Sequence, residues 1–418
     1  MGGASRALTR PLAVMVALAL AAHPARAQNH RPPIYQDPAR PVAVRVQDLL
    51  RRMTLEEKFW QLFMIPGDLD NPAHDYSHGI FGLQINTLPA GDSSAGAAKA
   101  HAERINAIQR YFALHNRLGI PIIPFEEAVH GLPRPGATIF PQAIALAATW
   151  DTALMERVAG AIADETRRRG IRQVLSPVIN VASDVRWGRV EETYGEDPFL
   201  VSRMGDAFVR AFEESGVIAT PKHFVANVGE GGRDSYPIEV SDRLLAEEFF
   251  PPFESALHRA HARSIMTAYN SVDGVPATQN HQLLTEVLKH RWGFTGFVIS
   301  DAAATGGATV LHMTEPSTPV AAQHAWEAGL DVVFQSSWEQ YRPYWNAVQR
   351  GLVSPRIIDA AVARVLRAKF ELGLFEHPYV DPDSAPADAA AHRALALDAA
   401  RQGMVLLRNE GGVLPLGA

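Results

Sequence analysis

The sequence predicts an α/β protein whose main domain is a (β/α)8 barrel, and two observations support this prediction. Seven short apolar runs alternate with longer helical patterns along most of the 418-residue chain. The runs are almost continuously apolar, which is typical of parallel strands that are buried on both faces. A succession of at least seven strand–helix units favours a closed barrel over an open sheet. The content of 47% hydrophobic and 20% charged residues fits a globular chain with a large core.

Each expected strand is a short apolar run, and several of the helical patterns between the runs end at a glycine. Gly119, Gly170 and Gly216 close three of these patterns, and glycine is the favoured residue just beyond a helix C-terminus. The stop signals therefore fall where an alternating strand–helix chain needs them. The runs lie at 79–85, 120–126, 173–181, 217–224, 264–270, 296–301 and 330–335.

The first residues have a different pattern from the expected barrel. Arg6 and Arg10 precede an apolar run at 12–22, and an Ala-Arg-Ala sequence follows at 25–27. A basic start, a short apolar centre and a small-x-small ending are the order of a secretory signal peptide. We therefore expect residues 1–27 to be removed and the protein to be periplasmic or secreted.

The sequence changes again after the expected barrel domain at 28–370. Residues 371–400 are rich in Pro, Asp and Ala, which is typical of a linker, although a helical pattern covers 390–402. Residues 401–418 predict a strand and a turn. We expect them to begin a second α/β domain that is truncated in this sequence.

Charge and cysteine content narrow the functional classes. A formal net charge of −6 argues against the basic face that nucleic-acid binding needs, so we expect no nucleic-acid partner. The lack of cysteine excludes disulfides and thiolate chemistry. His74, Asp75 and His78 lie close together, but Pro72 and Gly79 make this stretch a loop, so we expect no metal and no other cofactor. No segment after the signal peptide is expected to enter a membrane, and the oligomeric state stays open.

Polar residues follow the apolar runs at the C-terminal ends of the strands, where a barrel keeps its active site. Asp301 is the clearest of them, because it ends an apolar strand and is followed by three alanines and a Gly-Gly pair. These small side chains leave space beside the carboxylate, so we predict a ligand site there. The other polar residues are Glu127, Asp184, Arg186, Arg189, Lys222, His223, Tyr269, Asn270 and Gln335.

Several longer motifs, taken in their order along the chain, resemble one known family. They are EEAVHG at 126–131, RWGRVEETYGEDP at 186–198, KHFVAN at 222–227, SIMTAYNSVDG at 264–274 and GFVISD at 296–301. Together they resemble the exo-acting β-glucosidases and β-xylosidases of glycoside hydrolase family 3 over nearly all of the mature chain. The resemblance implies a TIM-like (β/α)8 barrel with most of a second domain absent. It also implies a β-glycoside or a small oligosaccharide as the substrate.

The resemblance assigns roles to six of the polar residues. Asp301 matches the nucleophile of a retaining hydrolase, which needs an ionised carboxylate and room for the sugar ring. Tyr269 matches a tyrosine whose hydroxyl donates to that carboxylate and helps to keep it ionised. The expected substrate-binding residues are Glu127, Arg189, Lys222 and His223. Because the family carries Asp or Glu at the first of these positions, glucose and xylose both remain open.

A retaining mechanism also needs an acid/base carboxyl about 5–5.5 Å from the nucleophile. In two-domain members of the family it comes from the second domain, so we expect it from a missing part. Single-domain β-N-acetylglucosaminidases use an Asp–His pair instead, whereas Asp234 and Ser235 are followed here by Tyr236, which disfavours an aminosugar hydrolase. Glu230 or Asp234 could replace the acid/base in principle. The alternative class is a non-catalytic or truncated sugar-binding barrel, which has no use for a nucleophile.

Overall fold

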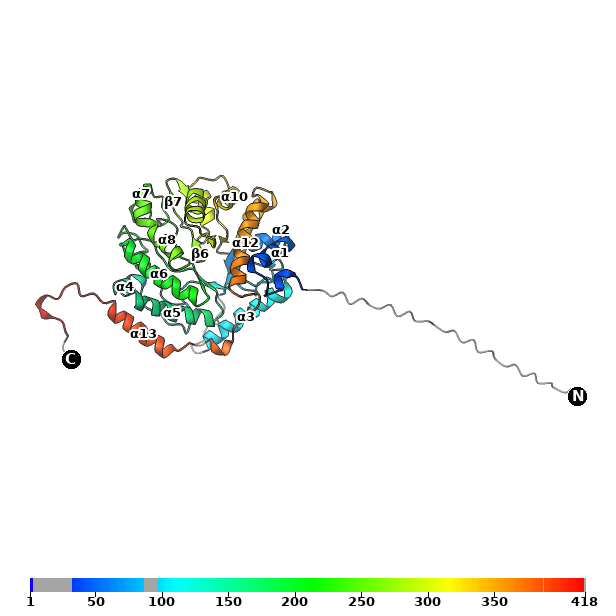
Figure 1. The fold of residues 1–418 in the computed structure, drawn as a ribbon, viewed down its shortest axis with the longest axis horizontal. Coiled ribbons are helices and arrows are strands. Elements are labelled where there is room, and N and C mark those ends of the chain that lie inside the picture. Colours follow the sequence, from blue (N-terminus) through cyan, green and yellow to red (C-terminus); the bar gives the residue numbers. More distant parts are fainter. Residues whose placement is uncertain (3–31, 86–95, 386, 417–418) are drawn as a thin grey trace.

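The computed structural model describes residues 1–2, 32–85, 96–385 and 387–416 of the chain (Figure 1). Helices surround a centre of short strands, and α13 (Ala389–Gln402) lies at one side before the C-terminal residues extend away from the rest. The strands of this centre are parallel, so the α/β class is confirmed. Residues 3–27 of the expected signal peptide lie outside the described residues.

Eight short parallel strands form the centre of the described part of the chain. Their pairing orders are β10–β1–β2, β3–β4–β5 and β6–β9. Most of the strand residues are apolar and buried, as expected of strands whose two faces are both covered. Their bounds are β1 (Phe63–Pro66), β2 (Gly82–Gln84), β3 (Phe125–Glu126), β4 (Gln173–Val174), β5 (Ile218–Ala219), β6 (Ser264–Met266), β9 (Phe297–Ile299) and β10 (Val333–Phe334). A separate antiparallel hairpin consists of β7 (Ser271–Val272) and β8 (Val275–Pro276).

Backbone hydrogen bonds also connect the three groups of strands to one another. In each bond a backbone amide of one segment donates to a backbone carbonyl of the segment beside it. The bonds are Ile123 N–H to Phe81 O (3.0 Å) between the segments of β3 and β2, Phe224 N–H to Met266 O (2.7 Å) between those of β5 and β6, and Ser300 N–H to Val332 O (3.0 Å) between those of β9 and β10.

Each of the seven predicted runs contains one of these strands, but the strands are shorter than the runs. The run 173–181, for example, is a strand only at Gln173–Val174, and the chain then continues irregularly toward the strand-end face. The sequence did not predict β1. Only Gln61 and Leu62 separate it from the preceding helix, so no glycine or proline marks the boundary.

Several helices begin at side chains that cap their first turn. Asp151 accepts hydrogen bonds from two backbone amides at the start of α5 (Thr152–Arg168), and Asp197 accepts one at the start of α6 (Pro198–Glu214). The other α-helices have the bounds α1 (Val42–Arg52), α2 (Leu55–Trp60), α3 (Ala97–His115), α4 (Ala143–Ala147), α7 (Asp242–Leu244), α8 (Pro251–His258), α9 (Ala304–Val310), α10 (Thr318–Ala328), α11 (Tyr341–Gln349) and α12 (Pro355–Glu371).

Helix α3 ends at His115, before the predicted stop at Gly119. The backbone of Asn116 is extended, and its side-chain Nδ2 donates to the carbonyl oxygens of Tyr76 (2.9 Å) and Ser77 (3.0 Å). The asparagine therefore ties the helix end to a neighbouring loop and stops the helix early.

A buried carboxylate joins the elements at the N-terminal end of β10. Asp331 is fully buried and accepts a hydrogen bond from the backbone amide of Val298 (2.9 Å). Arg364 of α12 donates to it from Nη2 (2.6 Å), and Lys289 Nζ lies 3.4 Å away. These partners offset the cost of burying the charge. This cluster lies at the opposite end of the strands from Asp301.

The strand predicted within 401–418 is wrong for the part that the structure describes. Residues 404–409 have no regular structure, and a 3-10 helix follows at Glu410–Gly412. Met404 and Leu407 are exposed. A strand needs backbone hydrogen bonds to a neighbour, and no described segment provides them here. The helix predicted at 390–402 is confirmed as α13.

Candidate active site

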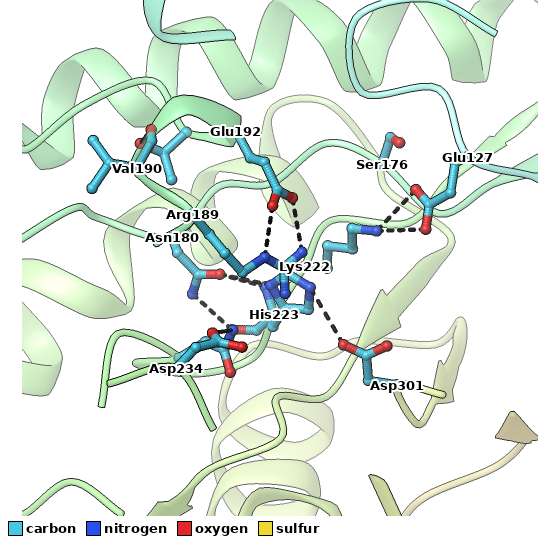
Figure 2. Close-up of polar contacts among 12 residues, drawn as sticks. Glu127, Ser176, Asn180, Arg189, Val190, Glu192, Lys222, His223, Asp234 and Asp301 are labelled. Atoms are coloured by element: carbon cyan, nitrogen blue, oxygen red, sulfur yellow. Dashed lines mark hydrogen bonds and ion pairs between the residues drawn. The ribbon is translucent and has the colours of Figure 1, made fainter. Parts of the chain in front are cut away.

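Four strands and the segments that follow them bring charged side chains to one place at their C-terminal ends. Glu127 directly follows β3, and Asp301 follows β9. Lys222 and His223 follow β5, and Arg189 comes from the long loop after β4. Because the strands are parallel, these ends meet on the same side of the fold. Figure 2 shows the side chains pointing toward one another.

Lys222 and His223 are neighbours in sequence, and both reach this cluster. Successive side chains of a regular strand point to opposite faces. The strand β5, however, ends at Ala219, and the following residues are not part of a regular strand. The ammonium group of Lys222 can therefore contact Glu127 while the ring of His223 faces Asp301 (Figure 2).

Both cations of the site are paired with carboxylates. Lys222 Nζ donates to Oε1 and Oε2 of Glu127 at 2.8 and 2.9 Å. Arg189 donates from Nε and Nη2 to the two oxygens of Glu192, each at 2.8 Å, in a bidentate pair. These four residues line a hollow of about 290 Å³ together with residues of the segment 129–133. Glu192 therefore belongs to the site as the residue that orients Arg189.

Asp301 is the buried carboxylate of the cluster, with 8% of its surface exposed. Its Oδ1 accepts a hydrogen bond from the backbone amide of Ala302 (2.7 Å), and its Oδ2 lies 3.4 Å from Nε2 of His223. Burial raises the pKa of this carboxyl, whereas Lys222, the Ala302 amide and Arg189 lower it. The net shift is upward, because the loss of solvent outweighs the nearby positive charge.

Asn180 holds His223 on the side away from Asp301 (Figure 2). Its Oδ1 lies 2.8 Å from the backbone nitrogen of His223 and 3.0 Å from Nδ1 of the ring, and its Nδ2 donates to the His223 carbonyl (2.9 Å). Burial lowers the pKa of His223 well below its usual value, and the charges of Arg189 and Lys222 act in the same direction. The sequence analysis missed Asn180; the only signal was a polar residue near the end of the apolar run 173–181.

Tyr269 completes the cluster from the segment after β6. Its hydroxyl interacts with Asp301, and this interaction lowers the pKa of the carboxyl. Burial raises the pKa of the Tyr269 hydroxyl, and the negative charge of Asp301 raises it further. His312 Nε2 lies 2.8 Å from the carbonyl oxygen of Tyr269 and fixes the backbone there. The structure thus brings together the six residues that the sequence analysis selected, namely Glu127, Arg189, Lys222, His223, Tyr269 and Asp301.

The loop at 229–237 carries the two carboxylates considered as replacements for an acid/base. Asp234 Oδ1 accepts hydrogen bonds from Trp187 Nε1 (2.8 Å) and from Asn227 Nδ2 (3.1 Å). Its carboxylate therefore joins this loop to the loop after β4. Glu230 is exposed to solvent.

The histidines at 74 and 78 have separate partners. Nε2 of His74 lies 3.3 Å from Glu339, and Nε2 of His78 lies 3.5 Å from Glu56. Over the described residues, no group of three or more His, Asp or Glu side chains is arranged to hold a metal ion.

The fold and the site together define the class of protein. Parallel strands surrounded by helices place a buried carboxylate and an imidazole near two paired cations that line a small hollow. A retaining glycoside hydrolase needs such a carboxylate at a strand end. Residues 54–368 match the sequence model described as the glycosyl hydrolase family 3 N-terminal domain. The chain therefore belongs to glycosyl hydrolase family 3, as its motifs predicted.

Similar proteins include β-glucosidases and β-xylosidases. A β-xylosidase of Formosa agariphila is 35% identical over 337 residues, which cover 75% of this chain and 47% of the relative. A periplasmic β-glucosidase of Salmonella typhimurium is 32% identical and covers 96% of this chain and 52% of its own length. The solved structure of a β-glucosidase from Erythrobacter marinus superimposes with a TM-score of 0.85 at 34% identity, over 91% of this chain and 52% of that chain. This chain thus spans about half the length of the relatives that it matches.

Proposed function

We propose that this chain carries the sugar-binding site and the nucleophile of a retaining exo-β-glycosidase that releases terminal β-D-glucosyl or β-D-xylosyl residues. The observation that carries the proposal is the position of Asp301, which is buried at a strand end beside His223 and Tyr269. The positive charges of Lys222 and Arg189 lower the pKa of its carboxyl, against the effect of burial. A β-glucosidase from Listeria innocua, whose solved structure contains glucose, is similar to this chain at 30% identity and a TM-score of 0.78.

The proposed reaction has two steps. In the first, a carboxylate oxygen of Asp301 forms a bond to the anomeric carbon, and the bond to the leaving oxygen breaks while that oxygen takes a proton from the acid/base. In the second, water attacks the same carbon, its proton passes to the base, and the Asp301 carboxylate is released. The positive charges of Lys222 and Arg189 help to keep Asp301 ionised for the first step.

The size and polarity of the hollow support a small neutral sugar as the ligand. Its volume of about 290 Å³ lies just below the range for small-molecule sites, about 300–1,000 Å³. Its walls carry donors from Lys222 and Arg189 and acceptors from Glu127 and Glu192. A sugar hydroxyl both donates and accepts, so such walls suit a pyranoside. Stronger binding of N-acetylglucosamine than of glucose or xylose, measured by calorimetric titration, would favour the aminosugar alternative.

We also propose that the acid/base comes from outside the described residues, as in two-domain members of the family. The carboxylates around the hollow already have partners, since Glu127 pairs with Lys222 and Glu192 pairs with Arg189. Asp234 is bonded to Trp187 and Asn227. The division into a barrel at 28–370, a linker at 371–400 and the start of a second domain at 401–418 remains a prediction.

The proposed domain is a closed (β/α)8 barrel. The parallel pairings within the three groups of strands and the backbone hydrogen bonds between the groups support this closure. Matches to solved β-glucosidases over about nine tenths of this chain add support.

The proposed location is the periplasm or the outside of the cell. The order of basic, apolar and small residues in 1–27 supports this location. The Salmonella typhimurium relative is itself a periplasmic β-glucosidase. Within the ranges that the structure describes, no helix has both the length and the apolar character needed to cross a membrane.

Covalent trapping tests the proposed nucleophile. A dinitrophenyl 2-deoxy-2-fluoro-β-glucoside has a leaving group that needs no proton, so the first step can proceed without the acid/base. We expect peptide mass spectrometry to find one label, on Asp301, and Asp301→Asn to abolish it. The exposed Glu191→Gln variant should be labelled like the wild type. Sugar binding by a folded chain that takes no label would instead favour the non-catalytic sugar-binding barrel.

A further inference from the structure

The side chain of Asn180 has only one orientation that satisfies its neighbours. The carbonyl oxygen of His223 can only accept a hydrogen bond, so the Asn180 atom 2.9 Å from it must be the nitrogen. The backbone amide of His223 can only donate, so the Asn180 atom 2.8 Å from it must be the oxygen. The two contacts together fix the amide, whose atoms could otherwise be exchanged.

This orientation determines where His223 carries its proton. The same Asn180 oxygen lies 3.0 Å from Nδ1 of the ring, and because this oxygen cannot donate, Nδ1 must. A neutral imidazole has one N–H, so Nε2 is left with a lone pair. Nε2 faces Oδ2 of Asp301 at 3.4 Å. Two acceptors therefore face each other when Asp301 is ionised.

The surroundings decide whether the ring stays neutral. His223 is 1% exposed, and Arg189 and Lys222 contribute positive charge near it. These conditions disfavour a second proton on the ring, and the carboxylate of Asp301 is the charge that favours one. Asn180 is uncharged and accepts from Nδ1 without stabilising an imidazolium as a carboxylate would. The balance therefore favours the neutral ring.

We propose that Asn180 is a positioning residue that holds His223 as the Nδ1–H tautomer, so that Nε2 accepts a hydrogen bond from a sugar hydroxyl bound beside Asp301. The second half of this inference rests on the proposed function. Lys222 and Arg189 have no acceptor atoms, so they can only donate to a sugar, whereas Glu127 and Glu192 are acceptors in the hollow. His223 adds a neutral acceptor beside Asp301, and there it selects a ring substituent that can donate. A fluorine atom at the same ring position cannot donate a hydrogen bond. It would face the lone pairs of His223 Nε2 and of the Asp301 carboxylate without a proton between them.

The tautomer can be measured directly, without any sugar. Nitrogen-15 NMR of the histidine-labelled chain distinguishes a protonated ring nitrogen from a bare one, and His223→Gln identifies the signal. We expect His223 to show a protonated Nδ1 and a bare Nε2. His101 provides an internal control of the opposite kind, because its Nε2 lies 3.1 Å from the carbonyl of Ile85 and must carry the proton. A protonated Nε2 on His223 in the wild-type chain would overturn the inference.

Two variants of Asn180 test whether this residue causes the tautomer. Asn180→Leu removes the acceptor, and we expect the proton to move to Nε2, where it can bond to Asp301. Asn180→Asp keeps the acceptor but adds a charge, and we expect both ring nitrogens to be protonated. An unchanged His101 signal shows that each variant is folded. A leucine variant that is folded and keeps Nδ1–H would show that Asn180 does not set the tautomer.

Binding of fluorinated sugars tests the acceptor role. We compare methyl β-glucoside with the analogues in which fluorine replaces each ring hydroxyl in turn, by calorimetric titration. At the position that faces His223 we expect binding about tenfold weaker, the factor that corresponds to about one hydrogen bond. Asn180→Asp should reduce the penalty at this position and leave any penalty at positions that face Glu127 or Glu192 unchanged. Equal affinity for every analogue would overturn the acceptor role. If methyl β-glucoside itself does not bind, the proposed function and the acceptor role fail together, whereas the tautomer is judged by NMR alone.

Discussion

The ammonium group of Lys222 lies between the carboxylate oxygens of Glu127, at 2.8 and 2.9 Å, and is also the strongest positive influence on Asp301. Lys222→Met should therefore raise the pKa of Asp301, because the ionised carboxylate loses a favourable charge. The nucleophile would then ionise only at higher pH. We expect the acidic limb of the trapping rate to move to higher pH, with at least about a tenfold loss of rate at acidic pH. Lys99→Met, which removes an exposed lysine paired with Asp383, is the matched control and should leave the profile unchanged.

Asp301→Asn should stabilise the protein at neutral pH. Folding raises the pKa of this carboxyl, so the folded state keeps its proton to a higher pH than the unfolded state does. The protonated form favours folding, and ionisation at neutral pH costs stability. We expect a gain of about 0.5–2 kcal/mol in urea unfolding at pH 7, as is common when a functional residue is replaced. The gain should shrink as the pH falls and Asp301 becomes protonated, and a gain that is constant across this range would contradict the argument.

Glu192→Gln should weaken sugar binding without removing the nucleophile. The bidentate pair with Arg189 becomes at most one hydrogen bond to a neutral amide, and charge-assisted bonds are about twice as strong as neutral ones. We expect the concentration of trapping reagent that gives half the maximal rate to rise about tenfold, with a smaller change in the maximal rate. Glu191→Gln removes the neighbouring exposed carboxylate and serves as the control. Equal effects of the two substitutions would mean that the pair does not position Arg189.

Asp331→Ala should reduce stability strongly and leave the chemistry of the folded protein intact. The substitution leaves Arg364 and Lys289 partly buried without their shared partner and takes the acceptor from the Val298 amide. Loss of one partner of a buried ion pair costs about 3–5 kcal/mol. Urea unfolding measures the loss, and trapping of Asp301 per folded molecule should be unchanged. Asp383→Asn, at an exposed ion pair, should cost less than about 1 kcal/mol.

The exported protein should begin at Gln28. The Ala-Arg-Ala sequence at 25–27 follows a basic segment and a short apolar run in the order of a cleaved signal peptide. N-terminal sequencing of the periplasmic or secreted protein measures the start. A purified protein that still carries residues 12–22 would contradict the prediction.

The strand-end residues were predictable because a charge that directly follows an apolar run is conspicuous. Asp301 and Glu127 each follow such a run, and the parallel arrangement then brings their strand ends together. The contacts between these residues were harder to predict from the sequence. The pairing of Arg189 with Glu192 depends on how the loop after β4 folds back, and the sequence does not show this.

Other features were missed for local reasons. Asn180 stands inside an apolar run, so its polarity looked like an interruption of a strand, whereas the strand β4 ends before it, at Val174. The strand β1 follows α2 without a turn residue. The strand expected near Leu407 failed because an apolar, extended sequence forms a strand only beside a partner, and single-chain patterns do not reveal one.

The two ion pairs of the hollow have a consequence for the entropy of binding. Lysine and arginine have long side chains that lose about 1.5–2 kcal/mol of rotamer freedom when they are fixed. Glu127 and Glu192 hold Lys222 and Arg189 through ion pairs within the chain itself. The entropy of these two side chains is therefore lost when the protein folds. A ligand that binds later contacts groups that are already immobile. The two ion pairs thus cost the folded protein some conformational entropy and reduce the entropy that is lost when a sugar binds.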